Sequence, residues 1–215
     1  MSLATRQWDL DGSFIRGLHG ELQSGDWSAR AGAAAIRFKH NLPIEDLRDT
    51  LRPFAPAAAD TLTVSETNSR FYNAGVVYDS GPLQVQLMLN RVNHDSVLFE
   101  NSRAAYLLAA YRIAQFTPFA GYSRMKSTPK QLSTGLPDVP FAALNSAVAS
   151  VLADSHADQR TRSLGVRWDA APKLDLKLQV DRIRGTPQSI FTWRGETAGW
   201  TGKTTVLSVT CDFIF

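Results

Sequence analysis

The chain has 215 residues, 44% of them hydrophobic, and its 23 basic and 20 acidic residues give a net charge of +3. No stretch approaches the ~18 consecutive apolar residues that a membrane-spanning helix needs. The small, interspersed charge excess is too weak to indicate a nucleic-acid-binding protein. A soluble β-rich domain and a transmembrane β-barrel both remain, because barrel strands are apolar only at every second position.

Nine segments have the alternation and composition of β-strands. In residues 83–90 and 174–181, leucine or valine recurs at every second position and the residues between are mostly polar. Such strands suit a wall between lipid and a wet lumen. We expect strands at 5–22 (one long strand, or one with a bulge), 27–39, 67–79, 83–93, 103–113, 116–126, 161–170, 174–184 and 204–215.

Short and long connections alternate four times along the chain. Residues 23–26, 80–82, 114–115 and 171–173 form tight turns, whereas 40–66, 94–102, 127–160 and 185–203 are long. Transmembrane barrels have short periplasmic turns and longer extracellular loops. A soluble sandwich has no reason to gather its long loops at one end so regularly.

Two of the long loops contain helical patterns. In segment 43–54, Ile44, Leu47, Leu51 and Phe54 recur at helical spacing, and segment 141–153 has a similar pattern. One interpretation is that each helix packs its loop onto the barrel rim. The other is that a loop folds into the lumen and narrows it, as in plugged barrels.

Aromatic residues fall mostly near strand ends, on the apolar side of the alternation. Aromatic rings favour the headgroup level and form girdles around transmembrane barrels. The alternative is that they are ordinary core aromatics of a sandwich. The residues are Tyr72, Tyr78, Tyr111, Phe116, Tyr122, Trp168, Phe213 and Phe215.

The strand count is odd, whereas bacterial single-chain barrels have an even number. We therefore expect residues 1–215 to form one partial β-barrel domain, the C-terminal portion of a barrel of about 14–18 strands. No signal peptide is visible at the N-terminus. The single cysteine, Cys211, lies on the apolar parity of the last segment and is expected to act as a small hydrophobe.

Three segments resemble proteobacterial porin-like outer-membrane proteins of Gram-negative bacteria. Segment 163–182 resembles their penultimate hairpin, 206–215 their closing strand, and 106–112 with 116–124 a central hairpin. The resemblance implies an all-β, antiparallel up-and-down transmembrane barrel in the outer membrane, without a cofactor, that passes small hydrophilic solutes or ions by passive diffusion. It also implies that Phe213 and Phe215 are the signal read by the outer-membrane assembly machinery. Further implied partners are the lipid bilayer with its lipopolysaccharide, the solutes, and two more copies in a homo-trimer, with no nucleic acid.

A channel needs a lumen lined by polar side chains. The polar positions of the strand alternation include side chains of both charges. We expect Arg112, Arg167 and Lys177 to bias ion passage. The alternative is that these charges form cross-strand ion pairs that only hold the wall together. The candidate lining residues are Arg112, Arg167, Asp169, Asp175, Lys177, Gln179, Asp181 and Asp212.

An enzyme is the rival class, and its best support is the segment Asn93–Ser96. Nucleophilic catalysis needs a histidine beside a serine and a third group that orients the imidazole. Neighbours on a strand point to opposite faces, so adjacency along the chain argues little. We predict no enzyme and no metal site. Two further alternatives are a non-conducting barrel that acts as an anchor or surface-binding module, and a soluble β-rich domain.

Overall fold

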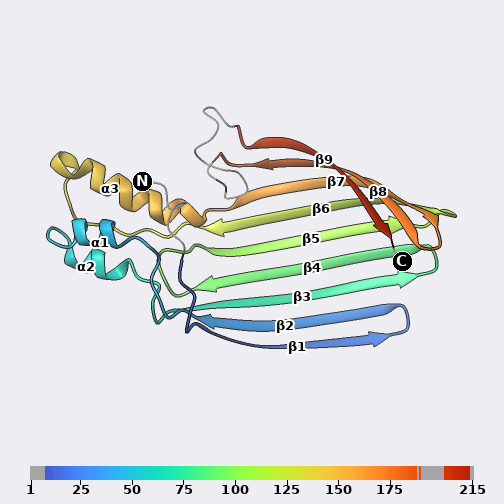
Figure 1. Cartoon of the computed structure of the whole chain (residues 1–215), viewed down its shortest axis with the longest axis horizontal. Helices are drawn as coiled ribbons and strands as arrows, with labels where there is room; N and C mark the ends of the chain where they lie inside the picture. Colours follow the sequence, from blue (N-terminus) through green and yellow to red (C-terminus); the bar gives the residue numbers. More distant parts are fainter. Residues whose placement is uncertain (1–7, 188, 190–200, 214–215) are drawn as a thin grey trace.

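The computed structural model describes residues 8–187, 189 and 201–213 and contains one nine-stranded sheet. Each strand pairs antiparallel with the next one in sequence, from β1 to β9 (Figure 1). The predicted limits of β2 to β9 are met to within three residues. The strands are β1 (Phe14–Ser24), β2 (Trp27–Arg37), β3 (Asn68–Ser80), β4 (Leu83–His94), β5 (Asn101–Tyr111), β6 (Phe116–Thr128), β7 (Asp158–Ala171), β8 (Leu174–Gly185) and β9 (Lys203–Phe213).

The first strand is shorter than predicted. It begins at Phe14 rather than at residue 5, and residues 5–7 lie outside the described part of the chain. The backbone turns at Gly12, where φ is +67° and the Ser13 amide donates to the carbonyl of Leu10 at 3.1 Å. A positive φ interrupts an extended strand, and glycine adopts it at little cost. Trp8 therefore leaves the sheet, and its ring lies 4.8 Å from the ring of Phe38.

Short and long connections lie at opposite ends of the sheet, as predicted. The four tight turns gather at one end, and the helices and long loops at the other (Figure 1). Gly25 and Gly81 occupy two of the tight turns with φ of +55°, the left-handed conformation that such turns require. We call the two ends the turn end and the loop end.

Both predicted helical segments are confirmed. Helices α1 (Glu45–Leu51) and α2 (Pro56–Thr61) lie between β2 and β3, and α3 (Asp138–Leu152), followed by the 3-10 turn η2 (Ala153–Ser155), lies between β6 and β7. They extend beyond the strand ends (Figure 1). The structure therefore favours rim packing over a loop folded into the lumen. Among the described residues, no helix is long and apolar enough to cross a membrane.

The buried apolar core lies at the loop end, not under the sheet. Leu51, Leu62 and Val64 are fully buried, and Leu98 and Val148 are almost so. These side chains come from the β2–β3, β4–β5 and β6–β7 connections and pack into one cluster. Each buried leucine or valine contributes about 1.5–3 kcal/mol, so this cluster holds the long loops together.

Polar contacts fasten the same loops to the strand ends. Lys130 Nζ donates to the carbonyls of His94 and Ser96, both at 2.7 Å. Burial lowers the pKa of this ammonium group, and the nearby Asp95 carboxylate opposes that shift. Asn41 Oδ1 accepts from the backbone amide of Val64 at 2.8 Å. The loop end is therefore an organised cap and not a set of independent loops.

Candidate functional site

The pairing register separates the sheet into two chemically distinct faces, because residues directly opposite each other in an antiparallel pair share a face. One row across β4 to β9 is apolar and the adjacent row is mixed, with polar, charged and small residues. We call the two sides the apolar face and the polar face. The apolar row is Val85, Ala109, Ala120, Leu164, Val180 and Leu207, and the mixed row is Gln86, Leu108, Gly121, Ser163, Asp181 and Val206.

The polar face is the concave one. Leu87, Leu89 and Leu107 on the apolar face are exposed, whereas Met88 and Tyr106 on the polar face are half-buried. Side chains on the inside of a curled sheet crowd together, and those on the outside spread apart. The chain thus presents apolar groups outward and mostly polar groups toward a hollow, as the alternation predicts.

Aromatic side chains mark the turn end of the apolar face. Trp27 and Tyr78 pack together with ring centroids 4.8 Å apart, and Phe116 stacks on Trp168 at 6.0 Å. Tyr111 also lies at this end and is half exposed. This is the position that a membrane-interface girdle requires. Phe213 is exposed at the end of β9, whereas Phe215 lies outside the described residues.

The candidate lining residues on β7, β8 and β9 all lie on the polar face, from the turn end to just past the middle of the strands. Asp169, Asp175 and Asp212 form one cross-strand row. Arg167 and Lys177 lie opposite each other in the next row toward the loop end, followed by Gln179 and then Asp181. Arg112 differs, because it lies exposed one residue beyond the end of β5, before the turn at 114–115.

Arg167 holds two of the three carboxylates. Its Nε donates to Asp169 Oδ1 at 2.7 Å, and its terminal nitrogen lies 3.1 Å from Asp175 Oδ2. Its side chain remains 52% exposed, so the cluster faces solvent. With Lys177, the two cations face three carboxylates, and the group has a formal charge of −1. Surface ion pairs of this kind are worth about 0–1 kcal/mol each, so their effect on the local field exceeds their effect on stability.

The side chain of Lys177 packs over the aromatic ring of Phe119. Its Nζ lies 4.9 Å from the centroid of Phe119, a cation–π contact. The Phe119 ring covers Gly165 on the next strand, where an added Cβ would come within 2.2 Å of the ring. The glycine thus lets the ring lie flat against the wall. Within the described chain, no carboxylate lies close enough to form an ion pair with Lys177.

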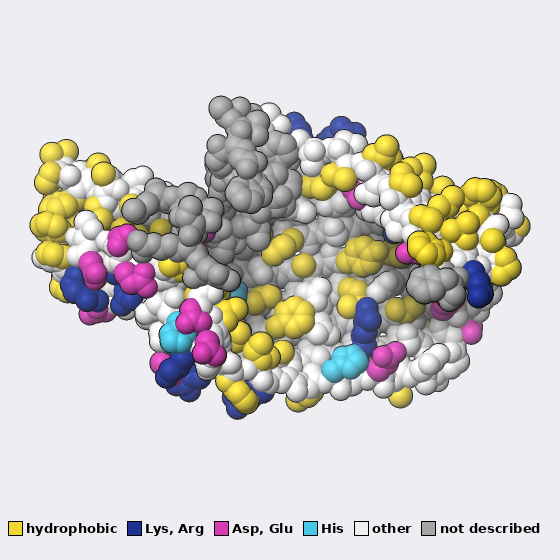
Figure 2. Space-filling view, viewed as in Figure 1, with side chains coloured by type: hydrophobic (Ala, Val, Ile, Leu, Met, Phe, Trp, Pro, Cys, Tyr) yellow, Lys and Arg dark blue, Asp and Glu magenta, His cyan; other side chains and the backbone are white. Residues whose placement is uncertain are grey.

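The structure adds charged residues that the sequence analysis missed. Glu21 and Arg30 lie opposite each other on the polar face of β1 and β2, next to His19. Arg30 also approaches the Met88 sulfur at 3.1 Å. The repeated alanines of segment 27–39 hid the parity of this strand, which the charged positions alone could have indicated. In the face shown in Figure 2, charged groups over the strands are few and of both signs.

The segment Asn93–Ser96 does not assemble a nucleophilic site. His94 Nδ1 lies 2.6 Å from Ser69 Oγ, and Ser96 Oγ donates to the carbonyl of Thr63 at 2.5 Å. Asp95 turns toward Arg70, which holds the pKa of that carboxyl below its usual value. The three side chains therefore serve separate structural contacts at the loop end.

A second serine, histidine and carboxylate cluster lies near the loop end. Glu100 Oε2 and Ser127 Oγ both approach the same nitrogen of His156, at 2.9 and 3.4 Å, and Ser127 also donates to Glu100. A catalytic triad instead places the imidazole between the serine and the acid, one on each nitrogen. Ser127 is buried and also bonds to the backbone of Ala157. The cluster clamps the start of β7 to the end of β6.

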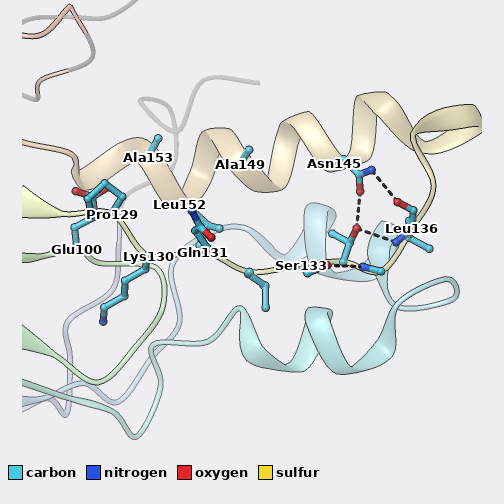
Figure 3. A pocket seen from close by; sticks show the side chains of 13 residues that line it. Glu100, Pro129, Lys130, Gln131, Ser133, Leu136, Asn145, Ala149, Leu152 and Ala153 are labelled. Atoms are coloured by element: carbon cyan, nitrogen blue, oxygen red, sulfur yellow. Dashed lines mark hydrogen bonds between the residues drawn. The ribbon is translucent and has the colours of Figure 1, made fainter.

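An open pocket of about 470 Å³ lies between α3 and segment 129–136 (Figure 3). Several of its polar groups are already engaged, since Asn145 Oδ1 accepts from Thr134 and its Nδ2 donates to the carbonyl of Leu136. Lys130 is committed to backbone carbonyls. Nor do the described residues contain a group of three or more potential metal ligands. The concave polar face is thus the candidate functional surface.

Comparisons with known proteins support this architecture. No protein-family model and no curated protein matches the chain. Two solved structures of OmpT, an outer membrane protein of Vibrio cholerae, one folded in vitro and one expressed in the outer membrane, match 93% of the chain at 14% identity, with TM-scores of 0.51 and 0.50. Pseudomonas aeruginosa OpdO matches 96% at 15% identity and a TM-score of 0.40.

The chain spans 53–54% of the OmpT structures and 63% of OpdO. At these identities the OmpT likeness concerns the fold alone, which is that of an outer-membrane β-barrel. The described part of the sheet is correspondingly open, because β1 and β9 do not pair with each other.

Proposed function

We propose that this chain forms part of the wall of an outer-membrane channel through which small hydrophilic solutes or ions diffuse passively. The observation that carries the proposal is the concave face, which bears charges of both signs opposite an apolar convex face. Such a surface suits a wet lumen inside a lipid-embedded barrel. The helices support the same function, since they lie beyond the strand ends and leave the concave face clear (Figure 1).

In this proposal the loop end faces the outside of the cell and the turn end faces the periplasm. The cluster of Arg167, Lys177 and three carboxylates then lies at the periplasmic side of the lumen. There it biases the passage of ions, because fixed charges act strongly in a narrow polar pore. The remaining strands of a closed barrel come from the rest of the protein or from partner copies, and Phe213 and Phe215 serve the assembly machinery.

Conductance of the full-length protein in planar lipid bilayers tests the proposal, with two matched tryptophan variants. Gly121→Trp places a large ring on the concave face, where an added Cβ meets its first neighbour at 3.4 Å, an ordinary contact. Ala120→Trp places the same ring one residue away, on the apolar face. We expect the first variant to lower single-channel conductance and the second to leave it unchanged.

Well-inserted wild-type protein that shows no conductance would contradict the proposal and favour a non-conducting anchor. Equal conductance of the two tryptophan variants would show that the concave face does not line the pathway. Insertion is checked separately, by protection of the strands from protease in vesicles.

A further inference from the structure

Basic residues gather on the apolar face at the loop end of the sheet. Arg124, Arg160 and Arg184 lie directly opposite one another on β6, β7 and β8, and Lys203 continues the row on β9. One row nearer the middle of the strands, Arg162 lies opposite Arg182. All of these residues have the parity of the apolar face, so their side chains lie on the outer surface. Each strand contributes one or two of them.

A second row of cations, two residues nearer the loop end, continues toward β4. Arg91, Arg103 and Lys126 lie opposite one another on β4, β5 and β6, and Asp158 on β7 ends this row. Neighbouring strands are ~4.8 Å apart, so each cation faces another at short range. Like charges directly opposite each other destabilise a sheet. We call Arg103, Arg124, Arg160, Arg162, Arg182 and Arg184 the basic belt.

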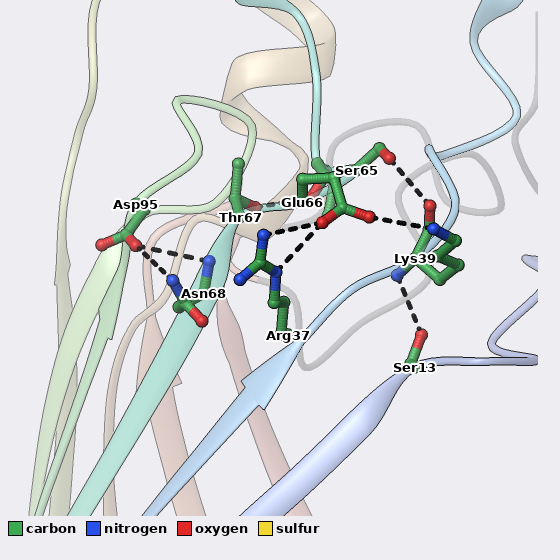
Figure 4. Close-up of polar contacts among 9 residues, drawn as sticks. Ser13, Arg37, Lys39, Ser65, Glu66, Thr67, Asn68 and Asp95 are labelled. Atoms are coloured by element: carbon green, nitrogen blue, oxygen red, sulfur yellow. Dashed lines mark hydrogen bonds and ion pairs between the residues drawn. The ribbon is translucent and has the colours of Figure 1, made fainter.

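The basic belt differs from the other outward-facing cations in its ion pairing. In the described part of the chain, none of its guanidinium groups forms an ion pair with a carboxylate. The contrast with β2 and β3 is direct, because there Arg37 and Lys39 share Glu66 at 2.8 and 3.3 Å (Figure 4). Arg70 is likewise paired with Asp95 at 2.7 Å. The protein neutralises its outer cations over β2 and β3 and leaves those from β5 to β8 open.

The position of the belt along the strands, relative to the aromatic girdle, indicates what surrounds it. Along β7, Trp168 at the aromatic girdle and Arg162 at the belt are six residues apart, which is about 20 Å of strand. The apolar residues Val166 and Leu164 fill the outer positions between them. Tyr122, opposite Arg162, is an interfacial residue type at the same level. The belt therefore borders the apolar band on its loop side, next to a residue type that favours lipid headgroups.

We propose that the basic belt binds the phosphate groups of a multiply phosphorylated lipid of the outer leaflet. This inference rests on the proposed outer-membrane placement and names a partner of the outer surface. Guanidinium groups bind phosphate in a bidentate manner, and a row of cations 4.8 Å apart needs several phosphates on one molecule or on neighbouring ones. The lipid thereby supplies negative charge to an outer face that, among the described residues of β5 to β8, carries a single carboxylate, Asp158.

The test uses the full-length protein in a zwitterionic detergent, with purified lipopolysaccharide, its enzymatically dephosphorylated form and phosphatidylcholine as probes. The belt variant is Arg124→Gln, Arg160→Gln and Arg184→Gln together. The matched control is Arg48→Gln, Arg52→Gln and Lys173→Gln, which removes the same charge from α1, its C-terminal cap and the β7–β8 turn. We expect the belt variant to bind lipopolysaccharide at least tenfold more weakly and the control variant to bind it as the wild type does.

A third variant with lysine at the same three belt positions keeps the charge and the fold, and is expected to retain most of the binding. Equal binding of intact and dephosphorylated lipopolysaccharide would overturn the inference, as would unchanged binding by the glutamine variant. Conductance and outer-membrane fractionation of the same variants keep the two proposals apart. If the glutamine variant inserts, conducts and still binds lipopolysaccharide normally, the proposed lipid binding by the belt is refuted and the proposed channel function is not. If the wild-type protein is absent from the outer membrane, the proposed function is refuted.

Discussion

Replacing Leu178 with arginine probes whether the apolar face meets lipid. Leu178 is 46% exposed and lies between Val166 and Val209 on neighbouring strands. Along β8 it is two residues from Leu176, at the aromatic girdle, and four from Arg182 of the belt, or about 7 and 13 Å. This position is close to the middle of the apolar band. An arginine there costs ~2–4 kcal/mol in a lipid-embedded barrel, against about 0–1 near the interfaces.

The assay is urea unfolding of the full-length protein in phosphatidylcholine vesicles, followed by tryptophan fluorescence. A loss of ~3 kcal/mol lowers the midpoint by about 1 M when the urea dependence is about 3 kcal/mol per M. Gln179→Arg is the matched control, because its side chain lies one residue away on the concave face. Leu174→Arg, at the turn end, is expected to cost far less. If Leu178→Arg costs no more than Gln179→Arg, the apolar face does not contact lipid.

Three further predictions concern the tail, the lining and the loop end. Deleting Phe215 should reduce outer-membrane yield severalfold while synthesis continues, and an unchanged yield in fractionated membranes would remove its role as an assembly signal. Arg167→Gln leaves two carboxylates without their cation, so reversal potentials in a salt gradient should shift toward cation selectivity; a shift toward anions would contradict the assigned lining. Asp95 has a pKa below its usual 3.8 because Arg70 hydrogen-bonds to it, so its stabilisation is complete above about pH 4 and is lost as the pH falls through the lowered pKa. Asp95→Asn should therefore weaken the loop end by ~0–1 kcal/mol at neutral pH and flatten its acid sensitivity in hydrogen exchange, and an unchanged acid profile would argue against this pairing.

Local sequence patterns were sufficient to predict the strands and the segregation of their connections. A period of two fixes which side chains share a face of one strand, and turn residues such as Gly25 and Gly81 fix where the chain reverses. The helical spacing around Leu51 was likewise sufficient to predict α1. The first strand was predicted too long, because the alternation continues through Trp8 although the backbone turns at Gly12.

The sequence by itself determined the two-faced strands and the candidate lining residues, since alternation is a property of each strand alone. Only the tertiary structure decided which positions of different strands lie side by side. The pairing of Arg167 with Asp175, the ring of Phe119 beneath Lys177, and the basic belt across β5 to β8 all depend on register. Register is set by turn geometry and by burial summed over the whole sheet, so it is not contained in any one segment.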